Sequence, residues 1–113
     1  MTKYLIGFDD GAMTFPAEEL PAVDVAAHAV VQAAKDAGVF VFAGGLTDPA
    51  ETRVVATDGT VTAGPDPERT RYLGGFAIVD VPSRAEALAW AAKFAVACRC
   101  AQAVRAILHD PAV

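Results

Sequence analysis

The stretch GFAIVDVPSRAEALAWAAKF, residues 75–94, decides the fold because it predicts a strand followed directly by a capped helix. Its first seven residues are almost all apolar, which is typical of a buried strand in the middle of a sheet. Ser83 then stands three residues before Glu86, the capping-box spacing that marks a helix start. We expect Trp90 at the edge of this helix and an inner face of Ala87, Leu88, Ala91, Phe94 and Ala95.

Further strands are expected on both sides of this stretch. Short runs rich in β-branched and aromatic residues end at turn residues, and Asp58-Gly59 between two of them is a strong hairpin signal. The final run alternates only weakly between apolar and polar residues. The strands predicted in this way cover residues 3–8, 39–43, 52–57, 60–62 and 102–108.

A second helix is predicted over residues 22–37, which contain no Pro or Gly and precede Gly38, a typical C-cap. Its apolar residues recur at helical spacing and predict one buried stripe. We expect that stripe to hold Val23, Ala26, Val30, Ala33 and Ala37, and the opposite side to hold Asp24, His28 and Lys35.

Two helices that each need a sheet, with strands grouped between them, favour an α+β fold: a ferredoxin-like α/β sandwich with an antiparallel sheet. Both helices then cover one face of the sheet. The strands nevertheless carry apolar residues on both sides, as Phe40 and Phe42 alternate with Val39 and Val41. An apolar sheet face is unfavourable in water, so we expect a homodimer that buries this face.

Composition bounds the class of protein and its partners. The 113 residues fit a single domain, residues 1–113, and 54% hydrophobic residues with 20% charged ones are typical of a globular chain. The net charge of −5 disfavours nucleic acid and membrane surfaces as partners. The start of the chain has no signal-peptide pattern, and Cys98 and Cys100 suit free thiols in a reducing compartment, so we expect a cytoplasmic location.

The segment AGPDPERTRYLGGFAIVDVPSRAEALAWAAKF, residues 63–94, resembles the signature region of the YCII-related family, in the branch named for a D-G-P-F motif. The matching positions are Gly64-Pro65, Glu68, Leu73-Gly74-Gly75-Phe76, Glu86-Ala87-Leu88 and Trp90-Ala91. The sequence departs from the motif at Ala63, in place of its aspartate, and at Asp66, in place of its phenylalanine. The resemblance implies a dimeric α/β barrel in which two sheets pack face to face.

The resemblance also suggests a catalytic pair, because some relatives are lyase-like enzymes thought to use a histidine and an aspartate in a cleft. The positions that match approximately are His28, in the first helix, and Asp48, after Gly44-Gly45. A neutral histidine is a suitable general base near pH 7, and an aspartate can orient it. His28 also lies four residues after Asp24, where it could simply be a solvated partner on the helix surface.

Other chemistry has less support in the sequence. The candidate ligand-binding residues are Arg53, Asp66 and Arg71, which could select a small anion or be solvated loop charges. We expect no metal and no cofactor, since the cysteines and histidines lack zinc-site spacing and no nucleotide-binding glycine motif is present. Two functions stay open. One is a non-catalytic ligand-binding or accessory module for a small organic molecule, and the other is a lyase- or isomerase-like enzyme using His28 and Asp48.

Overall fold

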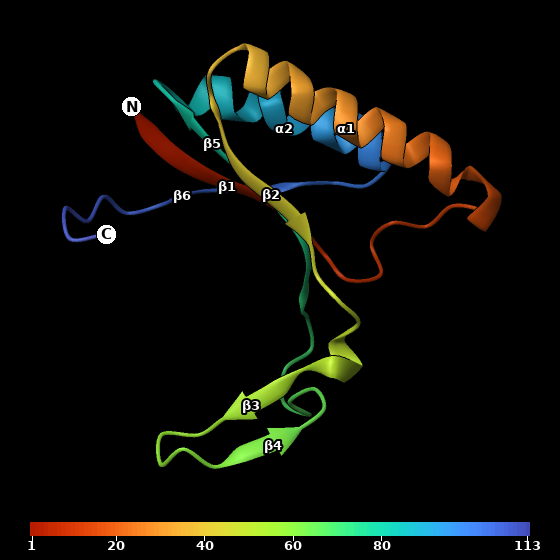
Figure 1. The fold of residues 1–113 in the computed structure, drawn as a ribbon, viewed down its shortest axis with the longest axis vertical. Helices are drawn as coiled ribbons and strands as arrows, with labels where there is room; N and C mark the ends of the chain where they lie inside the picture. Colours follow the sequence, from red (N-terminus) through yellow and green to blue (C-terminus); the bar gives the residue numbers. More distant parts are fainter.

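The computed structural model describes residues 1–113 and contains six strands and two α-helices (Figure 1). In chain order they are β1 (Thr2–Asp9), α1 (Leu20–Asp36), β2 (Phe40–Gly45), β3 (Arg53–Val55), β4 (Val61–Ala63), β5 (Leu73–Val81), α2 (Arg84–Cys98) and β6 (Ala103–Ala106). Short 3-10 turns cover Ala17–Glu19 and Pro49–Glu51. Each element expected from the sequence is present, and the ends that were predicted differ from the observed ones by at most two residues.

Four of the strands form one sheet in the order β2-β5-β1-β6, and every neighbouring pair is antiparallel. The helices follow β1 and β5, so each connects two strands that have another strand between them. This connectivity is consistent with the ferredoxin-like arrangement and confirms the expected α+β class. Strands β3 and β4 do not join this sheet but pair with each other as a separate hairpin.

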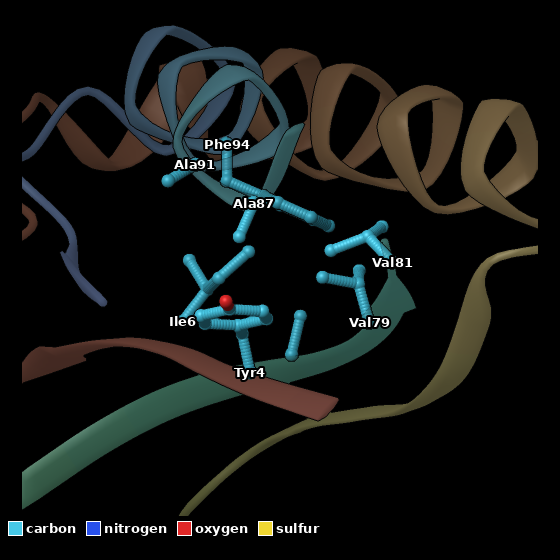
Figure 2. Close-up of a cluster of buried hydrophobic side chains, with 8 residues drawn as sticks. Tyr4, Ile6, Val79, Val81, Ala87, Ala91 and Phe94 are labelled. Carbon is cyan, nitrogen blue, oxygen red and sulfur yellow. The ribbon is translucent and has the colours of Figure 1, made fainter. Parts of the chain in front are cut away.

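Both helices cover the same face of the sheet and pack against each other (Figure 1). The core lies between α2 and the two central strands, as Figure 2 shows. Alternate residues of β5 are buried because successive side chains of a strand point to opposite faces. The core cluster consists of Tyr4, Ile6, Ala77, Val79, Val81, Ala87, Ala91 and Phe94.

The start of α2 agrees with the sequence, but part of its inner face does not. The Ser83 hydroxyl accepts a hydrogen bond from the Glu86 amide at 3.2 Å, so the predicted cap is confirmed. Leu88, expected inside, is 51% exposed. It lies about 100° around the helix from Ala87, and the buried residues continue instead along the stripe that reaches Ala97 and Cys98.

The buried face of α1 is also rotated from the expected one. Val23 is buried as predicted, whereas Ala33 and Ala37 are exposed and Ala34 is fully buried. Alanine fills much of this helix on every side, so the pattern of apolar residues only weakly distinguishes one face from its neighbour. The rotation turns Asp24, His28 and Lys35 toward the edge of the sheet instead of away from it.

The helix-free side of the sheet, here called the open sheet face, is largely apolar. By register, Leu5, Phe42, Phe76 and Ile78 share this face, and the rings of Phe42 and Phe76 lie 5.9 Å apart. The polar groups on it include Lys3 and Asp80, which pair at 3.7 Å, and Arg105 opposite Leu5. Neither α1 nor α2 combines the length and apolar character needed to cross a membrane.

Candidate functional site

A pocket of about 500 Å³ lies between α1 and the part of the sheet formed by β2 and β5. Phe8 of β1, Phe40 of β2 and Phe94 of α2 give it apolar walls, and glycines form part of its lining. Its polar side chains are those of Asp24, His28, Lys35 and Gln102. A larger hollow of about 700 Å³ between α1 and α2 has only Lys93 and Arg99 as charged groups, so it offers less chemistry.

His28 lies in the helix wall of this pocket, although its residue is exposed to solvent. No hydrogen bond or ion pair connects its imidazole to another side chain. Asp24 and Lys35 lie on the same side of the helix, one turn before it and two turns after it. The predicted pairing of His28 with Asp24 on the helix surface is therefore not formed, and both side chains border the pocket.

One end of the pocket is defined by Lys35 and Phe40. The ammonium of Lys35 lies 5.4 Å from the centre of the Phe40 ring, where the negative face of the ring attracts it. The positive charge is thus held beside an apolar wall. Both residues flank the Gly38 turn, which brings them near each other in the sequence. The contact was not predicted, because the sequence placed Lys35 on the side of α1 that faces away from the sheet.

Two glycines of the sheet, Gly45 and Gly75, border the pocket. Gly45 pairs with Gly75 across β2 and β5, and the ring of Phe8 occupies the space where Gly75 would carry a side chain. A Cβ on Gly45 would meet no atom within 4 Å. Since Gly45 borders the pocket, a side chain there would extend into free space beside it.

Asp48 is not among the residues that border this pocket. It caps the short turn Pro49–Glu51, where its carboxylate accepts a hydrogen bond from the Ala50 amide at 2.8 Å. The structure therefore does not bring Asp48 together with His28. The carboxylate that shares the pocket with His28 is Asp24, which the sequence offered only as a surface partner.

The three charged residues expected to bind a ligand lie outside the pocket as well. Arg53 is on β3 and donates hydrogen bonds to the carbonyl oxygens of Thr52 and Glu51, at 3.0 and 3.2 Å. Asp66 accepts a hydrogen bond from the Glu68 amide in the loop before β5. Arg71 lies 3.6 Å from Asp9, with 82% of its side chain exposed.

The two cysteines are free thiols, and Cys98 borders the pocket. Burial raises the pKa of the Cys98 thiol above its ordinary value of 9.0, and the nearby Cys100 raises it further. Burial also raises the pKa of Cys100, against an opposing hydrogen bond from Gln102. Both thiols are thus held in the protonated form, which is a poor nucleophile. No group of three or more His, Cys, Asp or Glu side chains is placed to hold a metal ion.

These features define a class of small α+β proteins with two helices on one sheet face and a histidine-bearing pocket beneath the first helix. The particular family follows from comparison with family models: the YCII-related domain matches residues 4–109, and the chain belongs to that family. The family expected from the LGGF region is thereby confirmed, whereas the D-G-P-F branch stays a prediction. A comparison with curated proteins finds no match to the chain.

Proposed function

We propose that this chain is a dimeric YCII-like domain that binds a small organic molecule without transforming it. The observation that carries the proposal is the state of His28, which borders an apolar pocket but has no hydrogen-bonded carboxylate. A general base needs a partner that fixes its orientation and stabilises its protonated form. The pocket supplies apolar walls and charge but not this partner, which favours binding over catalysis.

The proposed ligand is a small, mostly apolar carboxylate. Phe8, Phe40 and Phe94 favour an apolar body, and Lys35 at one end provides a counter-ion for an anionic group. Asp24 lies eleven residues before Lys35, about 16 Å along the helix, and repels an anion from the opposite end. The pocket therefore orients a carboxylate toward Lys35 and leaves His28 free to hydrogen-bond a second polar group.

Binding by small carboxylates, measured as a shift in the thermal unfolding midpoint, tests this proposal. For a carboxylate that binds, we expect the shift to disappear in Gly45→Val, where valine fills free space beside the pocket. We expect a smaller shift in Lys35→Met, which removes the counter-charge. Val54→Thr on the distant hairpin serves as a control and should leave the shift unchanged. Equal shifts in Gly45→Val and the unmodified protein would place the ligand elsewhere.

The homodimer is proposed because the single chain exposes too much surface. Its accessible area is 7664 Å², whereas a compact monomer of 11.7 kDa exposes about 5,900 Å². The excess is larger than the roughly 800 Å² that each partner contributes to a typical specific interface. Burying the open sheet face of two copies against each other, in the dimeric α/β barrel of the D-G-P-F branch, accounts for part of this excess.

Sedimentation velocity at micromolar concentration tests the dimer directly. We expect a dimer mass, and we expect Ile78→Lys, which places a charge in the middle of the open sheet face, to shift the protein to a monomer. Leu88→Lys on the exposed side of α2 is the matched control and should sediment like the unmodified protein. A monomer mass for the unmodified chain at this concentration would exclude the proposed interface.

The second candidate function is lyase- or isomerase-like catalysis by His28 and Asp48. The observation in its favour is that Gly45, only three residues before Asp48, borders the pocket. Catalysis by this pair would require the segment 46–52 to rearrange when ligand binds, because Asp48 caps a turn in the free protein. The assignment of Arg53, Asp66 and Arg71 to ligand binding also stays a prediction.

A further inference from the structure

The β3–β4 hairpin, residues 53–63, projects away from the rest of the molecule (Figure 1). Its strands pair with each other and with no strand of the main sheet. The radius of gyration of the chain is 15.8 Å, compared with about 13 Å for a compact domain of about 100 residues. The hairpin thus extends beyond the body that holds the core.

One side of the hairpin carries an uncovered pair of valines, next to Arg53 and Ala63 on the same side. Val55 and Val61 face each other across the two strands, and they are 64% and 60% exposed. Val54, paired with Thr62 on the other side, is 36% exposed. A two-stranded hairpin without further packing is marginally stable in water, so a hairpin of this kind needs a surface to cover it. No helix or strand of the same chain provides one.

We propose that the β3–β4 hairpin is a dimerisation arm whose Val55–Val61 side packs against a second copy of this chain. The proposal rests on the homodimer of the proposed function and adds an interface outside the open sheet face. In a two-fold dimer each arm makes the same contact, so the valine pairs of both copies are buried.

The size of the uncovered surface also points to a second copy. The accessible area exceeds that of a compact monomer of this mass by about 1,800 Å², more than one side of a typical interface. The projecting hairpin contributes to this excess, because every residue of its two strands is exposed. In a two-fold dimer, the two hairpins and the two open sheet faces are covered together. A different protein bound to the hairpin alone would leave the open sheet face exposed.

The test compares isosteric variants on the two sides of the hairpin. Val55→Thr with Val61→Thr keeps β-branched side chains but makes the valine pair polar, and we expect the dimer dissociation constant to rise about ten-fold or more. Val54→Thr makes the same change on the other side and should raise it less than about two-fold. Sedimentation equilibrium measures all three proteins across a range of concentrations.

Hydrogen exchange gives a second readout that does not depend on a variant folding correctly. The amides of Ala56 and Gly64 donate hairpin hydrogen bonds to Thr60 and Thr52, both at 2.8 Å. We expect their exchange to slow as the protein is concentrated through the dimer transition. A dimer with unchanged affinity in the double variant and no slowing at these amides would overturn the arm while leaving the sheet-face dimer intact. A monomeric unmodified protein would overturn both, and slowing of the amides only with another protein present would assign the arm to a different partner.

Discussion

Gly75 of β5 lies beneath the ring of Phe8 on β1, and a Cβ on Gly75 would stand 2.7 Å from the Cζ atom of that ring. Gly74, on the opposite face, has no more room, because its Cβ would lie 2.9 Å from the backbone nitrogen and the Cα of Asp10. Neither glycine has a positive φ angle. The LGGF region thus requires glycine for close packing between strands.

Valine at Gly74 should destabilise the fold more than valine at Gly75. At Gly74 the obstacle is backbone, which moves only with the strand, so we expect a loss of more than about 1 kcal/mol in the free energy of unfolding. At Gly75 the obstacle is the end of a side chain, and rotation of the Phe8 ring relieves part of the clash. Gly45→Val, which meets open space, is the control. If all three variants have the same midpoint in urea unfolding, close packing is not the reason for glycine at positions 74 and 75.

Arg99 joins the end of α2 to the start of α1, with its guanidinium 2.7 Å from the carboxylate of Glu19. Its backbone is left-handed, with φ of 56°, which costs about 1 kcal/mol for a residue with a Cβ. Arg99→Ala and Arg99→Gly both lose the ion pair, but only glycine removes the strain. We expect the glycine variant to be more stable than the alanine variant by about 1 kcal/mol in urea unfolding. Equal stability of the two variants would mean that the helix end relaxes to another conformation.

The sequence predicted the elements of this fold well because their signals are local. Ser83 and Glu86 mark one helix start, and Asp58-Gly59 marks one hairpin, without reference to the rest of the chain. The helix faces were harder, because α1 is rich in alanine and the position of its buried stripe depends on the sheet beneath it. The observed rotation of α1 places Asp24 and Lys35 beside the pocket, so the sequence did not predict them as pocket residues. Asp48 was predicted as a site residue from family resemblance alone.

The raised pKa of Cys98 predicts a specific dependence of stability on pH. The folded state keeps this thiol protonated, so the contribution of the thiol to folding stability is fully present below the ordinary pKa of 9.0. It is lost as the pH rises through the higher pKa of the folded protein, since the unfolded chain then binds fewer protons. We expect the urea midpoint to fall less between pH 8 and pH 10 in Cys98→Ala than in the unmodified protein. A steeper fall in the variant would contradict the buried, protonated thiol.

The final prediction concerns His28, where binding and catalysis lead to opposite results. The imidazole has no hydrogen-bond partner and is exposed, so His28→Ala should change the free energy of unfolding by no more than about 0.5 kcal/mol. A carboxylate held by Lys35 should still raise the thermal midpoint of this variant, because the counter-charge is two turns away on α1. If His28 is instead a general base, incubation with the ligand should yield a product, and His28→Ala should slow its formation about 10²–10⁴-fold.

Substitutions of Asp24 and Asp48 decide between these results, because only catalysis requires His28 to have a carboxylate partner. Catalysis by His28 and Asp48 requires Asp48→Asn to slow product formation as strongly as His28→Ala, while Asp24→Asn has little effect. Simple binding predicts no product in any of these proteins. Asp24→Asn should then tighten carboxylate binding slightly, because it removes a negative charge from the pocket that holds Lys35. Turnover that depends on both His28 and Asp48 would establish the enzyme and require segment 46–52 to close over the bound ligand.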